Sequence, residues 1–102
     1  MYILASDRHG TLYIGVTAQL ETRISIHKQD LIEGFTNRYG VHQLVYFEMH
    51  QTMDDAIRRE KQLKKWKRAW KLRLIDQVNP EWQDLMDETG VINPNGRGGQ
   101  VL

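Results

Sequence analysis

Residues 2–17 read YILASDRHGTLYIGVT, and this stretch decides the fold. Its two ends, residues 2–6 and 11–17, are rich in β-branched and aromatic side chains, which favour strands. The residues between them read DRHG and supply turn chemistry. The stretch therefore predicts an antiparallel hairpin that presents Tyr2 on its first strand and Tyr13 on its second.

The alternation of side chains in the second strand predicts where Tyr13 points. Successive side chains of a strand point to opposite faces of the sheet. Leu12, Ile14 and Val16 therefore share one apolar face, and Tyr13 lies with Gly15 on the other. We expect the Tyr13 side chain to leave the most apolar side of the sheet.

Helical and extended patterns alternate along the rest of the chain. Thr17 is placed to cap a helix that runs to about Ile32 and ends near Gly34. Residues 42–49, which read HQLVYFEM, predict a third strand. Residues 53–76 predict a helical region, in which acidic side chains in the first turn suit the positive end of the helix dipole.

The helical region 53–76 does not follow a single apolar stripe. One unbroken helix would place on one face Ala56, Glu60, Leu63, Lys67, Trp70 and Leu74. Trp66, Leu72 and Ile75 fall off this stripe. The pattern indicates either a break near Lys64 or two buried faces, and we favour the break.

The composition changes towards the C-terminal end. Pro80 ends the helical region, and residues 81–87 predict one more short helix that carries Trp82. Four of the eight glycines lie in residues 88–102, which predicts a mobile tail. We expect one folded domain over residues 1–87, followed by this tail.

The overall composition is that of an ordinary globular protein. A chain of 102 residues with 40% hydrophobic and 26% charged side chains can bury one core. No apolar run approaches the ~20 residues that a membrane span requires, and the first residues lack the pattern of a secretory leader, so we expect a cytoplasmic protein. The absence of cysteine excludes disulfides, thiol catalysis and cysteine-ligated zinc.

Basic charge is concentrated in one segment, although the formal net charge is only +1. Residues 58–73 contain nine of the fourteen Lys and Arg side chains, and Glu60 is the only acidic residue among them. Such a cluster attracts polyanions, and counterion release adds to nucleic-acid affinity; a solvated helix face is the alternative. The cations that we expect at a nucleic-acid interface are Arg23, Arg59, Lys64, Lys65, Lys67, Arg68 and Lys71.

Three side chains have the chemistry to cleave a phosphodiester. Glu60 lies on a packed stripe, where a carboxylate needs a partner, and a divalent metal ion and a salt bridge with Arg23 are equally good candidates. Arg23 could hold phosphate oxygens through its planar guanidinium group. His27, one turn later on the same predicted helix, could accept a proton or be a hydrogen-bonded core residue.

This ordered set of motifs resembles the GIY-YIG nuclease superfamily, in particular its small single-domain bacterial members. Residues 2–4 (YIL) match the first motif without its initial glycine, and residues 13–15 (YIG) match the second. The likeness extends over about residues 2–87 and continues through Arg23, His27, Phe35-Thr36 with Tyr39, residues 44–48, residues 59–64, Leu74-Ile75 and Asn79-Pro80. The resemblance implies an α+β fold in the order β-β-α-β-α-α, with a three-stranded antiparallel sheet flanked by helices, as in the nuclease domain of the excinuclease C subunit.

The resemblance also implies roles for individual side chains. Tyr13 would be the general base or would position the attacking water, and Glu60 would bind a single Mg²⁺ or Mn²⁺ ion. Arg23 would contact the phosphate. Three further residues would support them. Tyr2 would orient the water or the phosphate, and His27 would support the Tyr13 hydroxyl. Asn79 would close the site.

The sequence therefore predicts a metal-dependent endonuclease that hydrolyses DNA. It leaves open whether single-stranded, duplex or branched nucleic acid is cut, and whether RNA replaces DNA. The alternative function is a nucleic-acid-binding module without turnover, because Trp66 and Trp70 lie between the cations of the basic segment and could stack on bases. Core packing is the competing interpretation of both tryptophans, and we favour it for Trp70.

Overall fold

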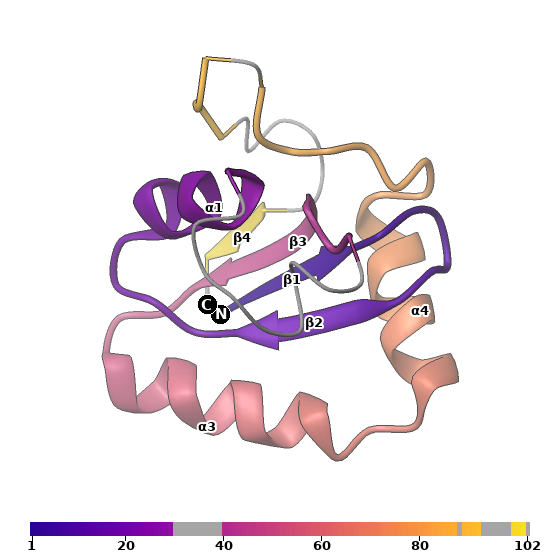
Figure 1. Cartoon of the computed structure of the whole chain (residues 1–102). Coiled ribbons are helices and arrows are strands. Elements are labelled where there is room, and N and C mark those ends of the chain that lie inside the picture. The colour runs from indigo at the N-terminus through magenta and orange to yellow at the C-terminus, as the bar shows by residue number, and fades with distance from the viewer. Residues whose placement is uncertain (30–39, 88, 93–98, 102) are drawn as a thin grey trace.

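A four-stranded sheet forms the centre of the molecule (Figure 1). The computed structural model describes residues 1–29, 40–87, 89–92 and 99–101. In sheet order, the strands are β2 (Leu12–Gly15), β1 (Tyr2–Ala5), β3 (Gln43–Met49) and β4 (Gly99–Val101). The three predicted strands pair antiparallel, as expected, whereas β4 runs parallel to β3 along its outer edge. The sequence did not reveal β4, and the predicted division into a domain and a tail stays a prediction.

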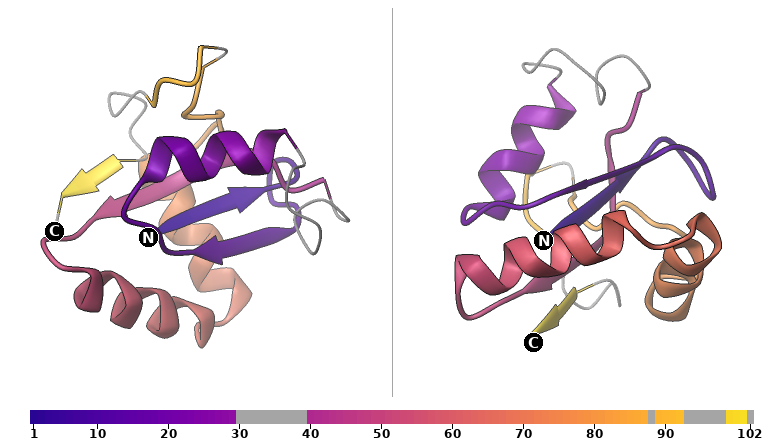
Figure 2. Two further views of the ribbon diagram at one scale, coloured as in Figure 1. Left: turned by 60° about the vertical axis from the view of Figure 1, so that its left-hand side comes forward. Right: turned by 90° about the horizontal axis from the view of Figure 1, so that it is seen from below.

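Helices cover both faces of the sheet (Figures 1 and 2). On one face, α1 (Leu20–Lys28) contributes Ile24 to a cluster with side chains of β1 and β3. On the other face, α3 (Met53–Lys64) and α4 (Arg68–Val78) contribute Leu63 and Ile75. The favoured break in the helical region is confirmed, since α3 ends at Lys64. None of the helices in the described ranges is long and apolar enough to span a membrane.

A β-bulge in β3 decides which side chains face α3 and α4. The ladder between β1 and β3 shifts register between Ile3 and Leu4, so Val45 is an extra residue in β3. Regular alternation is lost there, and Val45 and Tyr46 both join the apolar cluster beneath α3 and α4. Glu48, two residues after Tyr46, therefore points to this face as well.

Glu48 carries a buried carboxylate at the end of this apolar strand. Arg59 of α3 donates to both carboxylate oxygens, from Nε at 3.0 and 3.2 Å and from Nη2 at 3.1 Å. The Tyr46 hydroxyl donates to Oε2 at 2.5 Å, and His50 Nε2 lies 3.0 Å from Oε1. Burial would raise the pKa of Glu48, but hydrogen bonds from Arg59, Tyr46 and His50 outweigh burial and lower it. The ionised carboxylate thus ties β3 to α3.

The start of α1 differs from the prediction. Gln19, not Thr17, is the N-cap residue, and it makes no capping hydrogen bond through its side chain. The Thr17 hydroxyl instead accepts a hydrogen bond from the Gln19 backbone at 3.1 Å, which closes a turn ahead of the helix. The helix ends at Lys28, and the predicted end near Gly34 lies outside the described residues.

The short helix predicted over residues 81–87 is wrong. The Leu85 backbone donates to the Leu44 carbonyl at 2.8 Å, and the Leu44 backbone donates to Asp84 Oδ1 at 3.2 Å. Because the segment pairs with β3, its backbone groups are not available for helical bonds. Trp82 has a φ angle of 53°, which an α-helix cannot contain.

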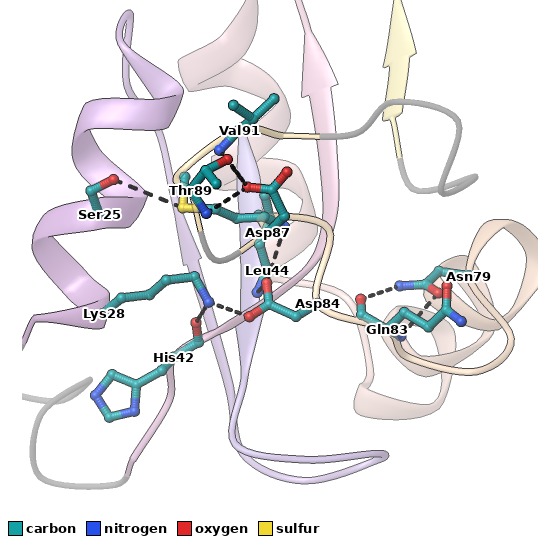
Figure 3. A network of polar contacts seen from close by, with 11 residues as sticks. Ser25, Lys28, His42, Leu44, Asn79, Gln83, Asp84, Asp87, Thr89 and Val91 are labelled. Atoms are coloured by element: carbon teal, nitrogen blue, oxygen red, sulfur yellow. Dashed lines mark hydrogen bonds and ion pairs between the residues drawn. The ribbon is translucent and has the colours of Figure 1, made fainter.

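Further polar contacts hold the segment after α4 against α1 and β3 (Figure 3). Lys28 Nζ donates to the His42 carbonyl at 3.1 Å and forms an ion pair with Asp84. Asp87 Oδ1 accepts two backbone hydrogen bonds, at 2.9 and 3.0 Å, from the turn that follows it. The core of the domain therefore extends beyond α4 through specific polar bonds.

Replacement of Arg59 with Met should destabilise the protein because the ionised Glu48 would remain buried without its main partner. Breaking one side of a buried ion pair costs ~3–5 kcal/mol. Arg59 is 23% exposed, so we expect the lower end of this range in urea unfolding. The neighbouring Arg58 is the matched control, because it is 78% exposed and its ion-pair partner among the described residues is Asp55 on the helix surface. Arg58→Met should change stability by less than about 0.5 kcal/mol, and equal losses in the two variants would contradict the structural role of Arg59.

Candidate active site

Three aromatic side chains from β1, β2 and α1 converge on one face of the sheet. The Tyr2 and Tyr13 ring centroids are 6.3 Å apart, and the His27 ring lies 6.0 Å from the first and 5.5 Å from the second. The hairpin register explains the approach of the phenols, since it places Tyr2 opposite Gly15 and Tyr13 opposite Leu4. His27 reaches them as a buried residue of α1. Three residues predicted for the site therefore lie together.

Gly15 makes room for the Tyr2 ring. A Cβ atom at position 15 would lie 2.5 Å from both Cζ and the hydroxyl oxygen of Tyr2. Tyr2 is only 1% exposed, so its ring has no free space to enter. The glycine of the YIG triplet is thus required by a close approach of the neighbouring strand.

The buried pair Tyr2 and His27 is electrically neutral near pH 7. Burial raises the pKa of Tyr2 to about 12, although hydrogen bonding with Arg23 lowers it. Burial lowers the pKa of His27, and the charges of Arg23 and His42 act in the same direction. The Tyr2 hydroxyl therefore keeps its proton and lies 3.2 Å from Nε2 of a neutral imidazole. The structure shows His27 beside both tyrosines and within hydrogen-bonding distance of Tyr2, and the support of the Tyr13 hydroxyl that the resemblance implied stays a prediction.

Arg23 places a cation at the border of this cluster. It is half-buried on α1, one turn before His27. Its charge acts on both Tyr2 and His27 and disfavours a second positive charge on the imidazole. The guanidinium group therefore belongs to the same polar environment as the buried phenol.

Glu60 lies on α3, and its side chain is 14% exposed. Its ion-pair partner is Lys64, with Nζ 3.3 Å from Oε1, so the alternative of a salt bridge with Arg23 is wrong. Burial lowers the pKa of the Met1 amino group, while the charges of Glu48 and Glu60 raise it. The charge of Glu60 therefore acts on the start of β1, where Tyr2 follows Met1.

A cavity of about 220 Å³ lies at this end of the sheet. Met1, Thr17, His50 and Ala56 contribute to its walls, so it separates the loop after β2 from the loop after β3. Ala56 precedes Glu60 by one helical turn. The helix that carries Glu60 therefore borders a concave surface.

Asn79 has a different environment from the one that the resemblance implied. It is 2% exposed at the end of α4, and Nδ2 donates to the carbonyls of Val45 and Gln83, each at 3.0 Å. Oδ1 accepts from the Gln83 backbone at 3.1 Å. Because the extra residue of a bulge is unpaired in the ladder, Asn79 completes the bulge at Val45. Its described contacts hold the fold and do not include the aromatic cluster.

Several cations predicted for an interface also hold the fold. Arg59 pairs with Glu48, and Arg68 Nη2 donates to the carbonyls of His9 and Gly10 at 2.5 and 2.6 Å. Lys65 is exposed and Lys71 is half-buried, and neither has an ion-pair partner within the described ranges. The basic segment thus divides into cations that tie α3 and α4 to the sheet and cations that remain available to a ligand.

The two tryptophans of the basic segment differ in burial. Trp66 is half-buried and packs against the apolar cluster beneath α3 and α4. Trp70 is 47% exposed, so the core packing that we favoured for it is wrong. The apolar stripe that places Trp70 with the core requires one continuous helix, and the break after Lys64 turns the following residues onto a different face.

Comparison with known proteins agrees with the motifs and the fold. The model of the GIY-YIG catalytic domain matches residues 1–73. The chain belongs to the GIY-YIG family. The predicted family and α+β fold are thereby confirmed. GIY-YIG domains are nuclease-type domains that act on nucleic acid and generally depend on a divalent metal ion.

The relatives of this GIY-YIG chain are small bacterial proteins. A UPF0213 protein of Syntrophus aciditrophicus (strain SB) is 40% identical over 83 residues, which cover 79% of this chain and 92% of the relative. A UPF0213 protein of Staphylococcus saprophyticus is 36% identical over 70 residues, which cover 69% and 85% of the two chains. A UPF0213 protein of Staphylococcus aureus (strain Mu3) is 39% identical over 67 residues, which cover 65% and 80%. No solved structure matches the chain significantly.

Replacement of Gly15 with Ala should destabilise the protein by overpacking the space beneath Tyr2. Overpacking of a buried site costs ~1–3 kcal/mol, and thermal unfolding with circular dichroism would measure the loss. The same substitution in a Tyr2→Leu background provides the control, because the hydroxyl end of the ring is then absent. Gly15→Ala should cost clearly less in that background. An equal cost in both backgrounds would show that Tyr2 is not the limiting contact.

Protonation of His27 should make stability depend on pH. Because the folded-state pKa of His27 is lowered, the unfolded chain binds this proton more readily than the folded chain. The neutral His27 side chain therefore contributes its full stability to the fold above the ordinary histidine pKa of ~6.5. This contribution is lost as the pH falls through the folded-state pKa. The free energy of unfolding should therefore fall more steeply between pH 7 and pH 5 in the wild type than in His27→Gln. Parallel curves would contradict this assignment.

Proposed function

We propose that this GIY-YIG domain is a metal-dependent endonuclease that hydrolyses phosphodiester bonds in DNA. One observation carries the proposal: Tyr2, Tyr13 and His27 converge on one face of the sheet beside the cation of Arg23. Phosphodiester hydrolysis needs an activated water molecule, positive charge at the phosphate and a stabilised leaving oxygen. The cluster contains a phenol that could activate the water molecule and a guanidinium group that could supply positive charge at the phosphate.

The two phenols differ in the work that they can do. Tyr2 is buried and keeps its proton, since its pKa is raised to about 12. It is therefore a hydrogen-bond donor in the site and a poor base. Tyr13 is half-buried on the edge strand β2, where water can reach it, so we assign proton removal from the attacking water to its hydroxyl.

Arg23 is assigned to the phosphate. Its guanidinium group can bind two phosphate oxygens at once, which lysine cannot do with the same geometry. Its half-buried position strengthens this attraction, because the surrounding medium screens charge less than water does. A neutral His27 next to it avoids repulsion between two cations and holds the Tyr2 hydroxyl in place.

Glu60 fits the role of a single protein ligand to a divalent ion. Its carboxylate is largely shielded from water, and its ion pair with Lys64 engages Oε1. No group of three His, Asp or Glu side chains that could hold a metal occurs in the described part of the chain. Mg²⁺ often binds proteins through only one or two carboxylates and keeps several waters, so Glu60 suffices. The bound ion would neutralise phosphate charge and stabilise the leaving oxygen.

Purified protein should cleave nucleic acid in Mg²⁺ or Mn²⁺, and the rate should depend on Tyr13 and Glu60. The panel contains single-stranded, duplex and branched DNA, with RNA of the same sequences. Tyr13→Phe should lower the rate by about 10²- to 10⁴-fold because the base is lost. Glu60→Ala should lower it by about 10²-fold or more. Absence of cleavage on every substrate, or equal cleavage by the Glu60 variant, would overturn the proposal.

Metal binding gives a readout that does not depend on turnover. Calorimetry with Mn²⁺ should detect one site in the wild type and none in Glu60→Ala, while circular dichroism shows an unchanged fold. Asp54→Ala is the matched control, because it removes an exposed carboxylate from the first turn of the same helix. Retained binding in Glu60→Ala, or its loss in Asp54→Ala, would refute Glu60 as the ligand.

A further inference from the structure

An apolar groove of about 340 Å³ runs along the outer side of α4. Its walls are formed by Trp66, Trp70, Arg73, Leu74 and Gln77. Ligand pockets in proteins typically have volumes of ~300–1,000 Å³, so the groove has room for one small planar ring system. Its lining combines two aromatic rings, one cation and one amide.

The groove exists because of the break between α3 and α4. On α4, Trp70, Arg73 and Gln77 lie on the side of the helix opposite the buried Ile75, since successive residues are separated by about 100°. Trp66 belongs to the connection before α4 and packs with one side against the core. It therefore stands beside α4 as a fixed wall.

The two tryptophan rings form a corner that is open to solvent. Their centroids are 6.1 Å apart and their planes meet at 82°. The Arg59 guanidinium carbon lies 5.3 Å from the Trp66 centroid, and Arg59 is itself fixed by Glu48. Trp66 is thus held between the core and a buried ion pair, while Trp70 remains 47% exposed. The Trp66 side of the corner is therefore preorganised.

Positive charge surrounds this aromatic corner. Lys67 Nζ lies 5.8 Å from the Trp70 centroid, and Arg73 is part of the groove wall. Lys65 and Lys71 are close in sequence, and no acidic residue occurs between Glu60 and Asp76. An apolar surface that pairs with an apolar protein partner does not require this charge. A ligand that joins a flat ring to a negative backbone matches both features.

We propose that the groove between Trp66 and Trp70 binds an unpaired nucleobase of single-stranded nucleic acid. The base stacks on the exposed ring of Trp70, and the flanking phosphates lie near Lys67 and Arg73. Stacking on tryptophan tolerates any base, because every base has a flat π-face. Gln77 offers an amide to the edge of the base. The proposal rests on the proposed function only because it takes nucleic acid as the ligand. It places the recognition of unpaired strands outside the cluster of Tyr2, Tyr13 and His27.

Fluorescence anisotropy with labelled oligonucleotides of about eight nucleotides tests this site, since single-strand sites span ~4–16 nucleotides. The measurement is made in EDTA, so binding is detected whether or not the protein cleaves. Trp70→Ala should weaken binding of single-stranded DNA by about 5- to 100-fold, and Trp70→Phe should weaken it less. The salt dependence should be unchanged in Trp70→Ala because no charge is removed. The same measurement with single-stranded RNA shows whether the bound base comes from DNA or from RNA.

Matched controls separate stacking from other effects. Met53→Ala removes another exposed apolar side chain from the neighbouring helix α3 and should leave binding unchanged. An oligonucleotide without bases should bind the wild type and Trp70→Ala equally, and blunt duplex should bind both equally. Glu60→Ala should bind single strands at least as well as the wild type, so a failure of the nuclease assay does not affect this test.

Two results would overturn the proposal. One is an unchanged single-strand affinity in Trp70→Ala, with a fold that circular dichroism shows to be intact. The other is an equal loss of affinity for single strands, duplex and abasic strands. The competing occupant of the groove is a second copy of the chain, and sedimentation velocity tests for it. A wild-type dimer that becomes a monomer in Trp70→Ala, with an unchanged affinity for single strands, would assign the groove to this dimer contact.

Discussion

The buried ion pair of Glu48 and Arg59 is the constraint on which the positions of both candidate sites depend. It joins the end of β3 to α3, and it does so with three hydrogen bonds from one guanidinium group. Glu60 directly follows Arg59, so fixing Arg59 also fixes the carboxylate proposed to bind metal. The same guanidinium lies against Trp66 and supports the wall of the groove on α4. A single pair therefore sets the geometry of two surfaces.

The second constraint is the close approach of Tyr2 to Gly15. It removes one phenol from water and raises its pKa to about 12, whereas the other phenol remains half-buried on the edge strand. Two tyrosines with similar local sequences thus acquire different environments. The difference comes from strand order, because β1 is central and β2 lies at the edge. The proposed division into a donor, Tyr2, and a base, Tyr13, rests on these positions in the sheet.

Local patterns predicted the three antiparallel strands, the break after Lys64 and the facing of Tyr13, because turn residues and side-chain periodicity act within a few residues. They failed where distant groups decide the outcome. The Leu44 carbonyl accepts a hydrogen bond from the Leu85 backbone, and the Leu44 backbone donates to Asp84, so the predicted helix does not form. Glu48 engages Arg59, which the charge pattern had assigned to a nucleic-acid interface. A charged residue at the end of the apolar run Leu-Val-Tyr-Phe was the available signal that a buried partner existed.

The basic segment shows why charge counts alone describe this surface poorly. Arg59 and Arg68 donate to groups of the sheet and of the β1–β2 turn, so their charges mainly serve the fold. Arg68 thereby ties the first turn of α4 to the β1–β2 turn, and Trp70, two residues later on α4, remains 47% exposed. The remaining lysines then surround an aromatic surface instead of a smooth polar helix. Cations that stabilise the fold and cations proposed to attract a ligand therefore lie on the same helix.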